Sequence, residues 1–448
     1  MARTVGARRS TALSRLAGLA DQGLSSGQNL LLLAVVARST DAVSFGAFSV
    51  AMTTAVLLIQ VGRALVAEPS LIILSGEDDE PKPFAQVALT LACGLSIAMS
   101  VVLAVAGLLL PVRFRPLFLV LAVAMPALLS QNACRFLLLA QKRTQATLAV
   151  DTAWVAAWAV LLIRFHHLST AEHLAAWSTS SALGTILGLF LLRPSRDKAA
   201  SQTRRRILRA SKSLLVELLA AVASGQILIF ALASIAGISA VGGLRAAQSV
   251  YGPVSTLMNA MMVVYMPVIA KQAPLSTRTA KRTATRLSIG CVALACMVLV
   301  GTRLIPTRLG TVAFGDTWAH AAPLLLPLGL QRVAGGAWLG AYIYLRATGK
   351  VPLSVRATIV GVVLETVLAV AAAPYSIFLA VNGMAAGTAV MAVLMWIPVV
   401  RPNRTARGRH ARHRRQTVIN TRPVGANPDP SSDSETTQII QRRQRGHH

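Results

Sequence analysis

The sequence predicts an all-α integral membrane protein of about twelve transmembrane helices, arranged as two pseudo-repeated six-helix lobes with both termini cytoplasmic. Three observations predict this class. Of the 448 residues, 54% are hydrophobic and 13% are charged, whereas soluble domains carry about 25% charged residues. Apolar runs that reach the roughly 20 residues needed to cross a bilayer recur about twelve times. A basic segment near the middle of the chain divides these runs into two sets of equal size.

The predicted spans are separated by short breaks that contain proline, glycine or charged residues. The first span follows a basic start and is interrupted by polar residues such as Asp21 and Asn29, so it reads as a membrane span and not as a signal peptide. The predicted spans lie near residues 14–37, 45–74, 84–110, 116–140, 145–165, 172–192, 213–236, 244–270, 286–306, 318–345, 352–373 and 376–400.

Orientation and domain boundaries follow from the distribution of lysine and arginine. One set of alternate loops and the N-terminus hold 23 of these residues and the other set holds 7, so the first set is predicted to face the cytoplasm. We expect an N-terminal six-helix lobe (1–192), a basic cytoplasmic linker (193–212), a C-terminal six-helix lobe (213–400) and a disordered basic cytoplasmic tail (401–448). A weak internal repeat supports the two lobes, because Leu137–Arg143 and Tyr344–Lys350 end corresponding spans.

Composition also excludes several classes of function. The net charge is +28, but the positive residues lie in short loops and in the tail, which indicates anionic membrane lipids as partners and argues against nucleic acid. The four cysteines lie inside apolar runs without a CxxC pair, so no metal site is expected. No Walker-type phosphate loop occurs and no cofactor is expected. No external loop is large enough for the active site of a polymerase or ligase, so we predict that the protein is not an enzyme.

Charged and amide side chains inside the spans are the candidate substrate-binding residues. Arg63, Arg135 and Arg332 fall in the second, fourth and tenth predicted spans. A charged group there is costly and usually faces a partner or a wet cavity. Guanidinium groups suit phosphate and diphosphate oxygens, and Gln131 and Gln331 could bind sugar hydroxyls. The competing interpretation is structural, with Arg63 paired to Glu68 and with the amides forming interhelical hydrogen bonds.

Four segments carry a resemblance to a known family. They are Phe45-Gly46-Ala47-Phe48; Arg245-Ala246-Ala247-Gln248 with the following Gly252-Pro253 and Met266-Pro267; Phe314-Gly315-Asp316-Thr317-Trp318; and Arg135 to Arg143 leading to Asp151 and Trp154. With these segments, residues 10–400 resemble the polysaccharide biosynthesis membrane proteins, the O-antigen-flippase branch of the multidrug/oligosaccharidyl-lipid/polysaccharide exporter (MOP) superfamily.

The resemblance implies a flippase of the cytoplasmic (inner) membrane that moves polyprenyl-diphosphate-linked sugars by alternating access. It implies that Arg63 and Arg332, then Arg135, contact the diphosphate. It also implies coupling to a proton or sodium gradient, for which the candidate residues are Asp21, Asp151, Glu217 and Glu365. Glycan polymerases or glycosyltransferases are expected partners of such a protein.

Two other functions remain open from the sequence. One is a drug/cation antiporter of the same superfamily, which would depend on an acidic residue of the N-terminal lobe such as Asp21 or Asp151. The other is a membrane scaffold that does not transport and that recruits envelope-synthesis enzymes through the tail, Arg401–His448.

Overall fold

The computed structural model describes residues 27–28, 30–76, 81–165, 168–195, 200–218 and 224–400, and within these ranges the chain forms helices and turns without a β-strand. The predicted tail lies outside the described residues.

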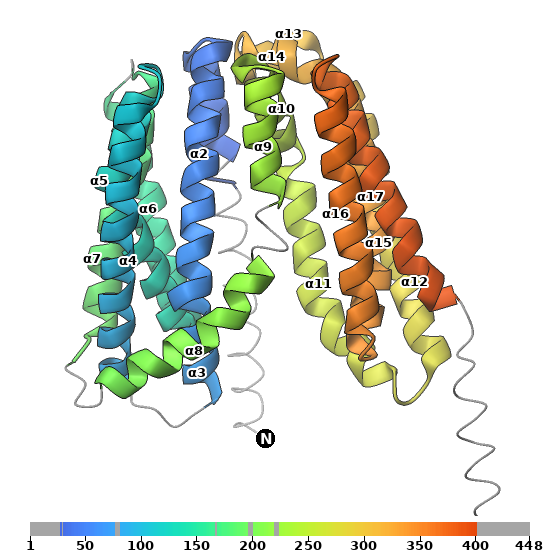
Figure 1. Cartoon of the computed structure of the whole chain (residues 1–448), viewed down its shortest axis with the longest axis horizontal. Coiled ribbons are helices and arrows are strands. Elements are labelled where there is room, and N and C mark those ends of the chain that lie inside the picture. Colours follow the sequence, from blue (N-terminus) through green and yellow to red (C-terminus); the bar gives the residue numbers. More distant parts are fainter. Residues whose placement is uncertain are drawn as a thin grey trace, which may run out of the picture. The chain divides into compact units, whose positions relative to one another are not determined.

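Figure 1 shows the helices and their labels. After a short helix at Leu30–Ser39, the elements are α2 (Ala42–Gly62), the π-helix η1 (Arg63–Ala67), α3 (Glu68–Gly76), α4 (Pro81–Leu109), α5 (Arg115–Ala140), α6 (Thr144–Arg164), α7 (Thr170–Leu192), α8 (Ala200–Leu218), α9 (Ser224–Ile235), α10 (Ile238–Val250), α11 (Gly252–Gln272), α12 (Thr277–Arg303), α13 (Thr307–Phe314), α14 (Thr317–Ala321), the 3₁₀ turn η3 (Ala322–Leu324), α15 (Leu325–Ala347), α16 (Val351–Ala372) and α17 (Ile377–Val400).

The number of membrane-crossing helices agrees with the sequence. In the described part of the chain, nine helices are long and apolar enough to cross a membrane. Two shorter apolar helices, Leu30–Ser39 and Gly225–Ile235, and the 23-residue α15 correspond to the remaining predicted spans. The predicted all-α, multi-pass membrane fold is therefore confirmed, while the side on which each terminus lies stays a prediction.

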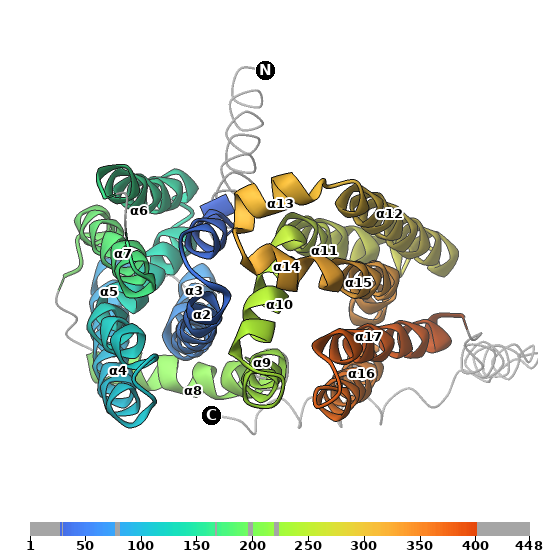
Figure 2. The ribbon, with the colours of Figure 1, turned by 90° about the horizontal axis from the view of Figure 1, so that it is seen from above.

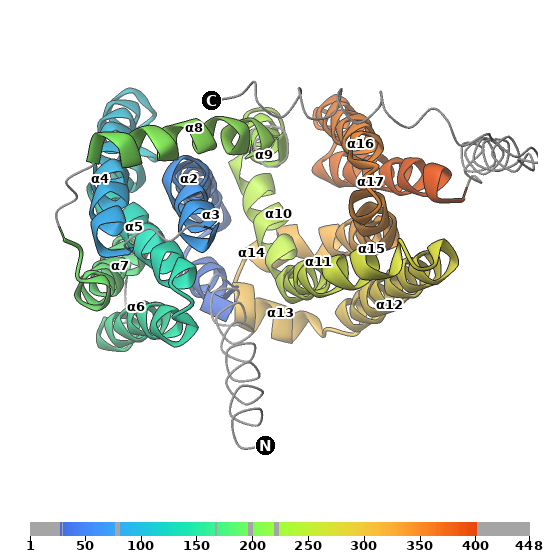
Figure 3. The same cartoon turned by 90° about the horizontal axis from the view of Figure 1, so that it is seen from below.

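The basic segment in the middle of the chain is largely helical. In α8 the side chains of Arg204 and Arg205 are exposed, while Ile207 is fully buried. It packs against η1, α3 and α4, and Figure 3 shows it running past α3 from α4 toward α9. The Ser211 hydroxyl donates a hydrogen bond to the Leu65 carbonyl at 2.6 Å. The helix therefore continues across the predicted linker boundary at 212 and packs on the first half of the chain; the domain limits themselves stay a prediction.

Two turns at corresponding places have the same geometry. The turn between α5 and α6 has a left-handed residue at Lys142 (φ 59°), and the turn between α15 and α16 has one at Gly349 (φ 74°). In each turn the next amide donates to a carbonyl five residues back, at 2.9 Å in the first and 2.8 Å in the second. This is a Schellman cap, which satisfies carbonyls at the end of a helix. The geometry supports the internal repeat that the sequence indicated at these positions.

The first half of the chain meets the second half where α2 crosses α10, and Figure 2 shows the two helices side by side. A Cβ at Gly46 would lie 2.1 Å from the Ile238 carbonyl oxygen, and a Cβ at Gly242 would lie 3.1 Å from the Ala42 carbonyl oxygen. The contact is reciprocal, because positions 42 and 46 of one helix meet positions 242 and 238 of the other.

Candidate functional site

Arg63 begins the π-helix η1 and forms an ion pair with Glu68. The Arg63 Nε lies 2.7 Å from Glu68 Oε1, with side-chain exposures of 41% and 29%. The Arg63 guanidinium also lies over the Phe136 ring, 4.9 Å from its centroid, a distance at which a cation is attracted to an aromatic face. The Arg63–Glu68 pair considered from the sequence is thus present, and substrate contact by Arg63 stays a prediction.

A second cluster joins α5 to α6. Asp151 is 5% exposed. Its Oδ1 accepts a hydrogen bond from Gln131 Nε2 at 2.8 Å, and its Oδ2 lies 3.0 Å from Arg135 Nε. These three residues were separate candidates in the sequence, two for substrate and one for an ion. The structure brings them together as a buried carboxylate with its charge compensated, which is the arrangement that burial of a charge requires.

A third cluster joins α15, α16 and α17. The Glu365 carboxylate accepts hydrogen bonds from Gln331 Nε2 at 2.9 Å and from the Thr388 hydroxyl at 3.3 Å. The charge of Arg332 lies close enough to Glu365 to interact with it. Gly387 allows α17 to approach closely, since a Cβ there would lie 2.5 Å from the Glu365 Cα.

Arg332 differs from Arg63 and Arg135 because it forms no ion pair with a described residue. In the described part of the chain, its buried Nε has no hydrogen-bond partner, and no carboxylate oxygen lies within ion-pair distance of its guanidinium. The charge of Arg332 also interacts with Tyr251 at the end of α10. The Tyr251 hydroxyl is itself fixed by a 2.8 Å hydrogen bond to the Leu325 carbonyl.

The second and third clusters lie at different depths. Arg135 and Asp151 are each about 8 residues from the left-handed residue of the α5–α6 turn, which is about 12 Å along a helix. Arg332 and Glu365 are each about 16 residues from the corresponding α15–α16 turn, or about 24 Å. The clusters resemble each other in chemistry, but they do not occupy equivalent positions of the repeat.

A fourth arginine, Arg245, stood at the very start of the predicted span 244–270 and lies within α10 in the structure. Its Nη2 donates hydrogen bonds to the Thr53 hydroxyl of α2 and, at 3.2 Å, to Gln226 Oε1 of α9. Its Nη1 donates to Gln248 Oε1 at 3.3 Å. All of its partners are neutral, and among the described residues no carboxylate pairs with it.

Arg245 lines a small cavity between the two halves. The cavity encloses about 180 Å³ and is bounded by Ser49, Met52 and Thr53 of α2, together with Leu33 and Val56. Arg245 is about 10 Å along α10 from its start, and Thr53 is about 16 Å along α2. Half the thickness of the hydrocarbon core is about 15 Å, so with both helix starts taken at the membrane surface we expect this cation near mid-depth.

The signal for Arg245 was present in the sequence. The predicted span began at residue 244, whereas α10 begins at Ile238. The six residues between contain two glycines, which lowered the apparent helix content. Of the other candidates, Asp21 lies outside the described residues, as does the side chain of Glu217.

The structure is similar to solved transporters. It matches "Lipid II flippase MurJ, inward closed conformation" over 87% of this chain and 88% of that chain, with a TM-score of 0.68 and 10% identity. It matches an outward-facing MATE-family multidrug resistance transporter of the MOP superfamily over 90% of this chain and 94% of that chain, with a TM-score of 0.57 and 13% identity. The eukaryotic MATE transporter AtDTX14 matches over 91% and 99%, with a TM-score of 0.53 and 15% identity.

Comparisons at the level of sequence give no such match. No family model matches the chain, and no curated protein sequence matches it. The structural likeness defines a polytopic α-helical membrane protein with a transporter fold. More particularly, the fold is that of the MOP-superfamily transporters, which confirms at the level of fold the resemblance found in the sequence.

Proposed function

We propose that the protein is a flippase that moves an anionic lipid-linked headgroup, such as a polyprenyl-diphosphate-linked sugar, across the cytoplasmic membrane. The fold supports a transporter, and a solved structure that shares it is a lipid II flippase. The charge inside the bundle supports an anionic substrate.

The observation that carries the proposal is Arg245. A guanidinium near mid-depth normally needs a carboxylate or an anionic ligand, because burying an uncompensated charge is costly. Arg245 has neutral partners only among the described residues, and it lines a cavity between the halves. A diphosphate entering the bundle would supply the missing negative charge through charge-assisted hydrogen bonds.

Arg332 is the second cation of the proposed site. It interacts with Tyr251, which follows Arg245 by six residues, or about 9 Å along the helix. Substrate contacts by Arg63, Arg135, Gln131 and Gln331 stay predictions. In the proposed site the last three contribute indirectly, because their side chains face Asp151 and Glu365.

Glu365 is the candidate that we retain for ion coupling. It has two neutral hydrogen-bond donors and lies near Arg332. A cation bound at Glu365 would neutralise the carboxylate, so that the charge of Arg332 would act more strongly on the substrate. Asp151 is less suited to the role, because Arg135 already compensates its charge.

Rocking of the halves about the α2–α10 contact would give alternating access. The named contacts between the halves (Gly46 with Ile238, Gly242 with Ala42, and Arg245 with Thr53) fall within about the first three turns of α2. We propose that these contacts close the external side and that a headgroup reaches Arg245 from the opposite end.

The test uses full-length protein in liposomes that contain a fluorescent polyprenyl-diphosphate-linked sugar, with a membrane-impermeant reductant to report its leaflet. Arg245→Gln and Arg332→Gln should each slow flipping by about 10-fold or more, since a hydrogen bond to a charged group contributes about 1.5–3 kcal/mol. Arg113→Gln, in the exposed α4–α5 turn, is the matched control and should flip at the wild-type rate.

Wild-type rates in both folded variants would refute the proposed site. Transport of a cationic dye by the wild type without flipping of the lipid would favour the antiporter. Absence of both activities in the full-length protein, together with loss of surface polysaccharide in cells on truncation at Arg401, would favour the scaffold.

A further inference from the structure

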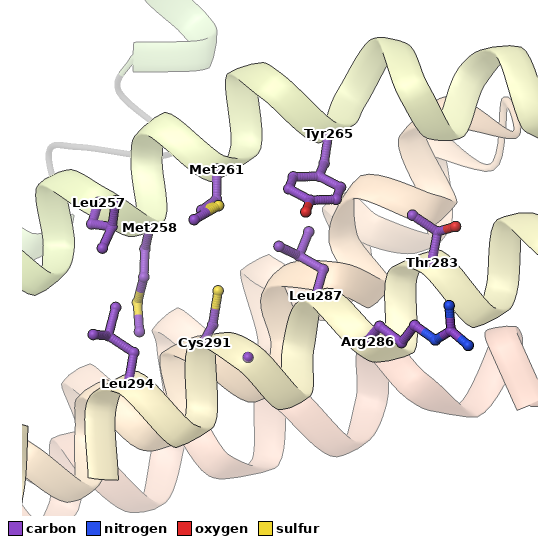
Figure 4. A pocket seen from close by; sticks show the side chains of 10 residues that line it. Leu257, Met258, Met261, Tyr265, Thr283, Arg286, Leu287, Cys291 and Leu294 are labelled. Carbon is purple, nitrogen blue, oxygen red and sulfur yellow. The ribbon is translucent and has the colours of Figure 1, made fainter. Parts of the chain in front are cut away.

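A groove between α11 and α12 lies outside the proposed substrate site. It encloses about 500 Å³, and Figure 4 shows its lining. From α11, the groove is lined by Leu257, Met258, Met261 and Tyr265. Their spacing of one, three and four residues places them on one face of the helix.

The opposite wall comes from α12 and is also apolar for most of its length. Leu287, Cys291 and Leu294 line it at the spacing of one helix face. From Leu287 to Leu294 the wall extends about 10 Å, which is most of the hydrocarbon thickness of one leaflet, about 15 Å. Methionines on the facing wall are flexible and adapt to irregular apolar shapes. The groove therefore fits a flexible hydrocarbon chain.

One end of the groove is positively charged. Arg286 lines this end, is exposed, and has no ion pair or hydrogen bond to a described residue. The hydroxyl of Thr283 beside it donates a hydrogen bond to Gln272 Oε1 at 2.8 Å. Arg282 lies one turn before Arg286 and is also exposed.

No acidic residue balances this charge along the chain. Between Glu217 and Asp316 the sequence contains neither aspartate nor glutamate. The same end of the bundle carries five basic residues between Lys271 and Arg286, and it is the end predicted to face the cytoplasm. Anionic lipids are abundant in the cytoplasmic leaflet, and each basic residue near its surface contributes about 1 kcal/mol of attraction.

We propose that this groove binds one anionic phospholipid, with an acyl chain between α11 and α12 and with the phosphate at Arg286. The length of the apolar walls fits a chain in one leaflet, and the unbalanced cation lies where the headgroup would be. The inference does not depend on the substrate proposed above.

Gly290 offers a way to fill the groove without disturbing the helix. It lines the groove, and a Cβ at this position would meet nothing within 4 Å. The indole side chain of the Gly290→Trp variant should therefore fill the space proposed for the acyl chain of the lipid. Gly301→Trp is the matched control, because Gly301 lies on the same helix, is equally open and does not line the groove.

The experiment is native mass spectrometry of the full-length protein, titrated with phosphatidylglycerol or with phosphatidylethanolamine of the same chains. The wild type should retain one phosphatidylglycerol in preference to phosphatidylethanolamine. Arg286→Gln should weaken phosphatidylglycerol binding about fivefold, which corresponds to about 1 kcal/mol, and leave phosphatidylethanolamine binding unchanged. Arg278→Gln, which removes an exposed basic residue outside the groove, should have less than half that effect.

Gly290→Trp should abolish retention of this lipid, while Gly301→Trp should retain it. Equal effects of Arg286→Gln and Arg278→Gln would overturn the proposal, since they would indicate general attraction to anionic lipid. Unchanged retention in Gly290→Trp would overturn it too. Retention of a polyprenyl phosphate in place of phosphatidylglycerol would assign the groove to a different occupant.

Discussion

Arg63 and Glu68 are joined twice, once through the backbone and once through the side chains. The Glu68 amide donates to the Arg63 carbonyl across the π-turn, and the Glu68 carboxylate accepts from Arg63 Nε at 2.7 Å. Residues five apart lie on different faces of an α-helix, whereas a π-turn brings them together. The π-helix is therefore what makes this ion pair geometrically accessible.

Variants of this ion pair can distinguish a structural role of Arg63 from a role in substrate binding. Because both side chains are partly exposed, the pair should contribute at most about 1 kcal/mol, and Arg63→Gln/Glu68→Gln should unfold thermally close to the wild type. If Arg63 contacts the substrate, as the sequence predicts, flipping should be slow in Arg63→Gln and in the double variant alike. Normal flipping in the double variant would leave Arg63 with a structural role only.

The Asp151 cluster should respond much more strongly. Asp151→Leu leaves the buried Arg135 without its carboxylate, and breaking a buried pair in this way costs about 3–5 kcal/mol. Arg135→Leu/Asp151→Leu should recover most of that loss, because no uncompensated charge remains. The measurement is the free energy of unfolding by denaturant in detergent. Additive losses in the double variant would show that the two side chains are not coupled.

Much of the fold was predictable, and the reasons are local. The spans follow from apolar runs of sufficient length. The repeated turn follows from two similar seven-residue segments, one containing Lys142 and the other Gly349. The Arg135–Asp151 contact could also have been predicted. Both residues are about 8 positions from the same turn, and two antiparallel helices bring such positions to one level. The sequence analysis instead gave them unrelated roles.

Other features could not be predicted from the sequence. A π-turn has no simple residue signature, so the Arg63–Glu68 geometry was not visible. The reciprocal contact of Gly46 and Gly242 depends on which helices cross, and the order of spans along a sequence does not reveal that. Arg245 was predicted at the edge of a span and not inside one, because the glycines before it concealed the start of α10.

The α2–α10 crossing predicts a graded effect of adding one methyl group. Gly46→Ala would place a Cβ 2.1 Å from a backbone oxygen, so the halves must separate, and overpacking of this kind costs about 1–3 kcal/mol. Gly242→Ala, with its nearest atom at 3.1 Å, should cost less. Gly94→Ala in α4 meets nothing within 4 Å and should stabilise the protein slightly, because alanine favours a helix. The check is thermal unfolding of the three variants, and equal melting temperatures would contradict the close crossing.

Asp41 caps α2 outside the membrane span. Its Oδ1 accepts hydrogen bonds from the amides of Val43 at 2.9 Å and Ser44 at 3.0 Å. Asp41→Ala should cost about 1 kcal/mol, while Asp41→Asn keeps an acceptor and should cost less. The hydrogen bonds from the Ser44 hydroxyl and amide lower the pKa of Asp41.

The sign of the pH dependence follows from that shift. A carboxyl whose pKa is lower in the folded state stabilises the fold above its unfolded pKa and loses this effect as the pH falls through the folded value. The difference in stability between the wild type and Asp41→Asn should therefore be constant near neutral pH and shrink below about pH 4. Melting temperatures of both proteins measured from pH 7 to pH 3 test this expectation, and a difference that grows toward acid would refute it.

Glu365 offers the test of ion coupling. Glu365→Gln keeps an oxygen that can accept from Gln331 or Thr388 and removes the negative charge, so the bundle should stay folded. Without that charge no nearby carboxylate offsets the charge of Arg332, and cation binding at this position no longer changes how strongly Arg332 attracts the substrate. Flipping by Glu365→Gln should therefore be independent of an imposed sodium or proton gradient, whereas the wild type should respond to one of them.

The assay is the liposome assay with each gradient applied in turn, and Thr366→Val on the same helix serves as the control for a lost side-chain hydrogen bond. If Glu365→Gln and the wild type depend on the gradients equally, coupling does not pass through this carboxylate, and its interactions with Gln331, Thr388 and Arg332 would be structural alone.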